Sequence, residues 1–114
     1  MKSVTKTIED IQREIQGGEL FPERASEILV TLSALMGNIL EEIRQRDMDY
    51  NMTLKRCLEE HLKANRAKIE AQVSPEWMAM KKAHDTKDIA LEMIRALKYF
   101  LKSKSEEYQT TKYQ

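Results

Sequence analysis

The side chains with the greatest capacity for chemistry are Cys57 and His61, which stand four residues apart in a helical segment. That spacing puts both on one face, where they could share a metal ion. A zinc site needs about four protein ligands, or about three at a catalytic centre, and only His84 and scattered acids are left as further candidates. Gly17-Gly18 ends a helix and is no phosphate-binding loop. We therefore expect no metal site, no cofactor, no catalytic residue and no enzyme.

A second set of side chains is basic and follows one long helical segment. Its members are Arg44, Lys55, Lys63 and Arg66. A spacing of eleven residues is about three helical turns, so Arg44, Lys55 and Arg66 are predicted to stack on one side, with Lys63 alongside, as a phosphate-binding stripe. The alternative is a solvated helix face, because Glu59 and Glu70 follow Lys55 and Arg66 by four residues and could pair with them.

A smaller basic patch is predicted near the C-terminus. Arg95, Lys98 and Lys102 share a helix face with Tyr99 beside them. Cations can bind the phosphates of a single strand while an aromatic ring stacks on a base. A soluble outer helix face is the alternative interpretation.

These side chains must be positioned by helices. Helix-forming residues dominate the composition and strand patterns are absent, which predicts an all-α fold. The central element is a long amphipathic run from Ala25 to about Gln72, one helix or two with a bend. Its apolar arc contains Leu29, Leu32, Met36, Ile39, Leu40, Ile43, Tyr50, Leu54, Cys57, Leu58, Leu62 and Ile69. One such helix cannot bury this arc alone, so we expect the copies to pack as an oligomeric helical bundle.

Shorter patterns flank the central run. A short helix in residues 1–18 begins near Ser3 or Thr5 and ends at the two glycines. Ser74-Pro75 predicts the start of a long C-terminal helix. Residues 19–108 form the binding and oligomerisation domain, and residues 109–114 a flexible tail. The apolar stripes of the two flanking helices are Ile8, Ile11 and Ile15 in the first, and Met93, Ile94, Leu97, Phe100, Leu101 and Tyr108 in the second.

Asp47 interrupts the apolar arc of the central run. An isolated carboxylate in such a position is costly to bury. The sequence leaves two alternatives: a bend or an inter-subunit charge pair at Asp47, or an unbroken helix with Asp47 on the rim.

The overall balance of charge and cysteine constrains the setting. The 19 basic and 19 acidic residues cancel, so net charge favours no class of partner. A single cysteine indicates a reducing compartment, and neither a signal peptide nor a membrane-spanning stretch is present in the sequence. We expect a cytoplasmic protein, in the host cytoplasm if a phage encodes it, with no membrane partner.

Around Leu54-Lys55-Arg56-Cys57-Leu58 the chain resembles the bacteriophage UvsY-like recombination mediator family, whose central helix carries a leucine-lysine-x-arginine-leucine motif. The resemblance covers roughly residues 25–107. It implies a non-enzymatic, ring-forming protein that binds single-stranded DNA and helps a recombinase displace a single-strand-binding protein. Lys55 corresponds to the DNA-contacting lysine. The arginine position is Cys57 here, with Arg56 as a substitute displaced by about 100° around the helix.

Two functions follow from these observations. The first is a homo-oligomer that binds single-stranded DNA through Lys55, Arg56, Lys63 and Arg66 and assists recombinase loading, with the recombinase or single-strand-binding protein as a further partner. The second is a structural or assembly-chaperone protein that binds another helical protein through the apolar arc and has no nucleic-acid role.

Overall fold

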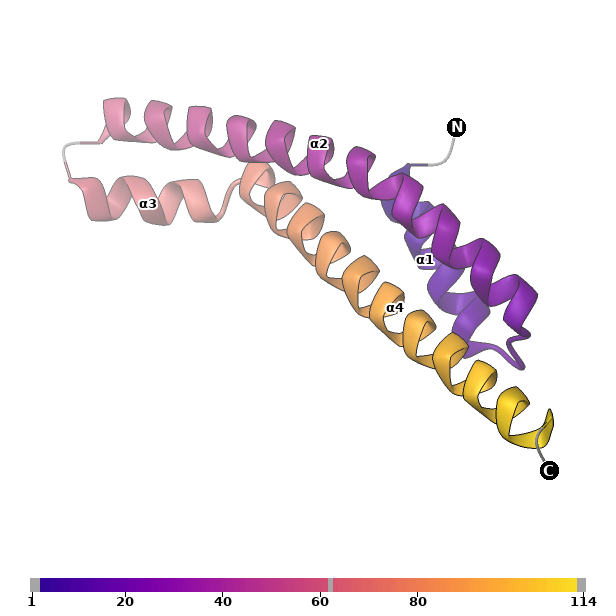
Figure 1. Ribbon diagram of the computed structural model, residues 1–114. Helices are drawn as coiled ribbons and strands as arrows, with labels where there is room; N and C mark the ends of the chain where they lie inside the picture. Colours follow the sequence, from indigo (N-terminus) through magenta and orange to yellow (C-terminus); the bar gives the residue numbers. More distant parts are fainter. Residues whose placement is uncertain (1–2, 62, 113–114) are drawn as a thin grey trace. The chain divides into compact units, whose positions relative to one another are not determined.

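The protein is helical throughout the part that the structure describes. This computed structural model describes residues 3–61 and 63–112, with side chains as far as residue 109. Within those ranges it contains four helices and no strand: α1 (Val4–Gln16), α2 (Pro22–Glu60), α3 (Ala64–Gln72) and α4 (Pro75–Lys112) (Figure 1). The all-α prediction is confirmed.

The central run does not form the element that its periodicity predicts. A single or merely bent helix from Ala25 to Gln72 is wrong beyond Glu60, where α2 ends. Lys63 has extended backbone angles, φ −109° and ψ 127°, and α3 begins at the next residue. Figure 1 shows α3 running back beside the end of α2. Leu62, which was predicted to lie in the apolar arc, is outside the described residues.

The α2–α3 hairpin is held by small side chains. Cys57 of α2 forms a buried cluster with Ala67 and Ala71 of α3, both 0% exposed, and Tyr50 and Leu54 pack against it. Alanine lets two helix backbones approach closely. The antiparallel arrangement therefore follows from burial between residues distant in sequence, which outweighs the local helix propensity of the segment at 61–63.

The residues divide into two compact units. The terminal unit comprises residues 1–37 and 88–114, and the hairpin unit comprises residues 38–87. In the terminal unit, α1 buries Ile8 and Ile11, and α4 buries Met93 and Leu97, as predicted. Tyr108, predicted on the same α4 stripe, is instead 69% exposed. The α4 helix continues to Lys112, into the segment predicted as a flexible tail.

Asp47 lies on an unbroken stretch of α2, half-exposed, in the hairpin unit. Its Oδ1 is 2.9 Å from Nε2 of His84 on α4. Asp47 therefore has a partner within its own chain, and an inter-subunit charge pair stays a prediction. The alternative, an unbroken helix with Asp47 on the rim, is confirmed.

Ser74 caps the N-terminus of α4, as its sequence pattern predicts. The Ser74 Oγ accepts a hydrogen bond from the Trp77 backbone N–H at 3.2 Å and donates to the Ala71 carbonyl at 2.6 Å. We expect Ser74→Ala to lower the free energy of unfolding by about 1 kcal/mol, because one helix-end N–H loses its partner. Urea denaturation measures the change. Ser33→Ala, on the exposed part of α2, should have no destabilising effect, and equal losses in both variants would contradict the cap.

Arg24 of α2 joins α1 through Glu14 in the terminal unit. Its Nε and Nη2 donate to the two carboxylate oxygens of Glu14 at 2.6 and 2.8 Å. This hydrogen bonding, opposed by partial desolvation and aided by the positive charge of Arg24, lowers the pKa of Glu14 below its ordinary value of 4.5. A carboxyl whose pKa is lower in the folded state adds stability above its unfolded pKa and loses that stability as pH falls through the folded value.

We therefore expect acid destabilisation of the terminal unit to be shallower in a Glu14→Gln variant. Urea midpoints measured from about pH 6 down to about pH 3 should converge with those of the unmodified protein at the acid end. The exposed Glu19 provides the control, Glu19→Gln, which should follow the unmodified curve. Parallel curves for Glu14→Gln and the unmodified protein would contradict the role of this pair.

Candidate nucleic-acid interface

The four cations predicted to bind nucleic acid lie on the hairpin unit, on both sides of the turn between α2 and α3. Lys55 and Arg56 are in the last two turns of α2, Lys63 precedes α3, and Arg66 is in its first turn. All four side chains are exposed. The hairpin therefore gathers at one end of this unit residues that the sequence spreads over twelve positions.

The buried cluster of Cys57 and Ala67 brings the segments that carry two of these cations together. Arg56 immediately precedes Cys57 on α2, and Arg66 immediately precedes Ala67 on α3. Because the two small side chains are in one buried cluster, the two arginines come from adjacent parts of neighbouring helices. This arrangement replaces the single-helix stripe. The predicted stacking of Arg66 with Lys55 on one helix is wrong, because α2 ends at Glu60.

Arg44 and Lys55 do share one face of α2, about three turns apart. Together with Asp47, Met48, Asn51 and Met52 they line a shallow open groove on the hairpin unit. Met48 and Met52 are 57% and 66% exposed, and the Asp47 carboxylate is in contact with His84. The two cations of this groove can contact phosphates, and the exposed methionines between them can contact bases.

Few of the basic side chains near the α2–α3 turn form ion pairs with acidic side chains. Arg56 is 3.9 Å from Glu60, and Arg44 pairs with Glu41 at 2.8 Å. Among the described residues, Lys55, Lys63 and Arg66 make no ion pair or hydrogen bond through their side chains, so the pairings considered for Lys55 with Glu59 and for Arg66 with Glu70 do not form. Three of the four positive charges are consequently available to an anionic ligand.

Burial explains the departure from the leucine-lysine-x-arginine-leucine motif. Cys57, at the motif's arginine position, is only 6% exposed and belongs to the hairpin core. An arginine at that position could not extend into solvent without opening the hairpin. Arg56, one residue earlier, is exposed, and it is therefore the side chain of this segment that can reach a ligand beside Lys55.

The second basic patch is on α4 in the terminal unit. Arg95, Lys98, Tyr99 and Lys102 are all exposed, and Tyr99 is 75% exposed. Arg95 is already in contact with Glu92. This patch has fewer free cations than the hairpin and contains one aromatic ring.

Metal chemistry finds no support at Cys57 and His61. Cys57 is buried and His61 is half-buried at the end of α2. In residues 3–61 and 63–112, no group of three or more His, Cys, Asp or Glu side chains could hold a metal ion. Over the same ranges, none of the helices combines the length and apolar character that crossing a bilayer requires.

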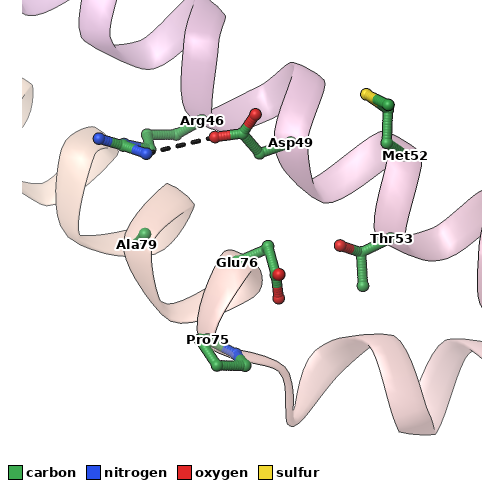
Figure 2. Close-up of a pocket in the computed structure, with 7 residues that line it drawn as sticks. All are labelled: Arg46, Asp49, Met52, Thr53, Pro75, Glu76 and Ala79. Carbon is green, nitrogen blue, oxygen red and sulfur yellow. Dashed lines mark hydrogen bonds and ion pairs between the residues drawn. The ribbon is translucent and has the colours of Figure 1, made fainter.

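The sequence interpretation missed a pocket between α2 and α4 of the hairpin unit, shown in Figure 2. Arg46 and Thr53, which line it, occupy the positions of a seven-residue repeat that begins with Leu32 and Ile39. Polar residues on an otherwise apolar helix line were the available signal. The residues of α4 that line the same pocket, among them Glu76, could not be identified without the packing of the two helices.

Comparisons of this chain with protein-family models, with curated proteins and with solved structures find no match.

Proposed function

We propose that this protein is a non-catalytic helical protein that binds single-stranded DNA through Lys55, Arg56, Lys63 and Arg66. The observation that supports this most directly is the exposure of four cations around one turn, three of them without an acidic partner. Cations that are not neutralised within the protein can displace counterions from phosphates, which is the main source of affinity in non-specific nucleic-acid binding. The resemblance to UvsY-like mediators adds a wider role, in which the bound strand is passed to a recombinase.

The proposal includes self-association. The hairpin unit exposes large apolar side chains, with exposed fractions between 45% and 71%: Met48, Met52, Leu58, Ile69, Val73 and Met78. Side chains of this kind gathered in one small unit are typical of surfaces that associate. Copies that cover these side chains would present repeated sets of cations to one strand. Each further set then binds at a high effective concentration, so weak single-subunit contacts add to a tight complex.

Charge reversal tests the nucleic-acid site. We expect Lys55→Glu combined with Arg56→Glu to weaken binding of a labelled oligothymidine by about a hundredfold or more, because two charge-assisted contacts become repulsive. Fluorescence anisotropy at low salt measures the change. Both side chains are exposed, so circular dichroism should show an unchanged helical content.

The matched control is the same change of charge on the other basic patch. Arg95→Glu combined with Lys98→Glu alters two exposed side chains of α4 in the terminal unit and should leave binding within about twofold, apart from the uniform effect of net charge. Loss of binding in this variant alone would indicate that DNA binds at the basic patch of α4 and not at the hairpin. Absence of binding by the unmodified protein would overturn the proposed function.

The exposed apolar side chains also favour a second candidate, a structural or assembly-chaperone protein that binds another helical protein. In that case Met52, Ile69 and Val73 would contact the partner, and the cations would only form part of the solvated surface of the hairpin. The same variants separate the two functions. The Lys55 and Arg56 charge reversal would leave capture of a helical partner intact, and the unmodified protein would retain no DNA.

A further inference from the structure

The pocket between α2 and α4 of the hairpin unit has a partly polar lining. It has a volume of about 460 Å³ and is open on one side. Arg46, Asp49 and Thr53 line it from α2, and Pro75 and Glu76 from the first turn of α4 (Figure 2). All of these residues belong to the hairpin unit. The lining thus combines two carboxylates, one hydroxyl and one guanidinium.

The charges around the pocket do not cancel. The Arg46 guanidinium donates to Glu42 at 2.8 Å and to Asp49 at 3.2 Å. These two carboxylates, Glu42 first, raise the pKa of Arg46, and both pair with this cation within the protein. Glu76 makes no ion pair or hydrogen bond with any described residue. Among the residues that line the pocket, one positive charge therefore faces two negative charges, those of Asp49 and Glu76, and the pocket favours a cation.

Thr53 gives independent reason to expect a ligand. The residue is only 6% exposed. Thr31 and Thr86 donate their hydroxyls to the carbonyl four residues earlier, at 3.0 and 2.9 Å. The Thr53 hydroxyl makes no such bond, nor any other with a described residue. The Thr53 side chain is thus nearly buried, and its hydroxyl has no protein partner among the described residues.

The Thr53 hydroxyl oxygen is reachable from the pocket. Among the described residues, no side-chain nitrogen or oxygen is both sealed from solvent and without a hydrogen-bond partner. Since Thr53 has no partner, its oxygen must be open to the pocket. Figure 2 shows this oxygen directed toward the side of the pocket where the Glu76 carboxylate lies. A hydroxyl oxygen that is accessible from the pocket and a carboxylate without a protein partner thus face the same space.

We propose that this pocket binds an ammonium or guanidinium group. Such a group provides the positive charge that Glu76 and Asp49 favour and several N–H donors for the carboxylate and the Thr53 oxygen. A guanidinium fits best, because its planar fork presents donors to two acceptors at once. A divalent metal fits poorly, since no group of three or more His, Cys, Asp or Glu side chains in the described residues could hold one. The site is separate from the DNA-binding cations of the turn.

The test is an NMR titration of ¹⁵N-labelled protein with methylguanidinium, with neutral methylurea as the matched ligand at equal ionic strength. We expect saturable shifts of the Thr53 and Glu76 amides with methylguanidinium and none with methylurea. Two further probes distinguish the source of the cation. Tighter binding of a Gly-Arg-Gly peptide amide would indicate a protein side chain, and tighter binding of spermidine a free polyamine; either result supports the site.

Variants assign the binding to the named groups. Glu76→Gln should weaken methylguanidinium binding by about tenfold, the effect of losing one charge-assisted contact. Thr53→Val keeps the shape of the side chain and should weaken binding by a smaller factor. Glu70→Gln, an exposed acid of α3, is the control and should change nothing. The proposal would be overturned if methylguanidinium binding did not saturate or if methylurea caused equal shifts. It would also be overturned if Glu76→Gln and Thr53→Val bound methylguanidinium as tightly as the unmodified protein.

Discussion

Raising the salt concentration from about 50 mM to about 200 mM is expected to weaken single-stranded DNA binding by about fiftyfold for a single set of the hairpin cations. Four positive charges lie on the two sides of the turn between α2 and α3: Lys55, Arg56, Lys63 and Arg66. Each neutralised phosphate of a single strand contributes about −0.7 to the slope of log affinity against log salt, so four contacts give a slope near −3. Oligomers that engage several sets should give a steeper dependence.

The slope also identifies which charges are responsible. In the Lys55→Glu and Arg56→Glu variant the slope should fall to about half, because only Lys63 and Arg66 can still neutralise phosphates. The measurement is an anisotropy titration at several salt concentrations, with light scattering at each to confirm that the assembly state is constant. A slope near zero in the unmodified protein, or an unchanged slope in the variant, would contradict phosphate binding at the turn.

The elements that could be predicted from the sequence are those fixed by local interactions. Ser3, as a possible cap, predicts the start of α1, and the helix begins at the next residue, with the Ser3 side chain accepting a hydrogen bond from the Lys6 N–H. Ser74 caps α4 in the same way. Each of these ends depends on one side chain acting within about one helical turn, which is information that a short stretch of sequence contains.

The break between α2 and α3 depends on contacts that no short stretch contains. Residues 61–63 include neither glycine nor proline, and their composition suits a helix. The chain turns there because Ala67 and Ala71 can pack on Cys57, which is a property of three residues on two helices. The prediction from periodicity alone continued one helix through residues 61–63. It also placed Leu58 and Ile69 on one arc of a single helix, whereas they lie on α2 and α3 and are 45% and 63% exposed.

The candidate site shows the same division. The residue types could be chosen from the sequence, and all four cations are exposed. Their arrangement could not, because it follows from the hairpin that the periodicity missed. The pocket at Thr53 could not be predicted from the sequence either. The carboxylates that line it belong to helices that are separate in sequence, Asp49 to α2 and Glu76 to α4.

Replacement of Leu97 by alanine is expected to lower the free energy of unfolding of the terminal unit by about 2–5 kcal/mol. Leu97 is 2% exposed and is among the largest fully buried side chains. Its removal loses the transfer free energy of the deleted methyl groups and leaves a cavity in a core that also contains Ile8 and Leu32. Since small domains are stable by only about 5–15 kcal/mol, this is a large fraction of the total.

Urea denaturation gives the magnitude of the Leu97→Ala effect, and amide hydrogen exchange gives its location. Protection should fall first at the α1 amides around Ile8 and Ile11, because α1 is short and its buried face depends on the core of the terminal unit. Tyr99→Ala, on the same helix but 75% exposed, is the control and should stay within about 0.5 kcal/mol of the unmodified protein. If both variants lost similar stability, Leu97 would not occupy a packed core. If neither lost any, the terminal unit would not be held together by its apolar side chains.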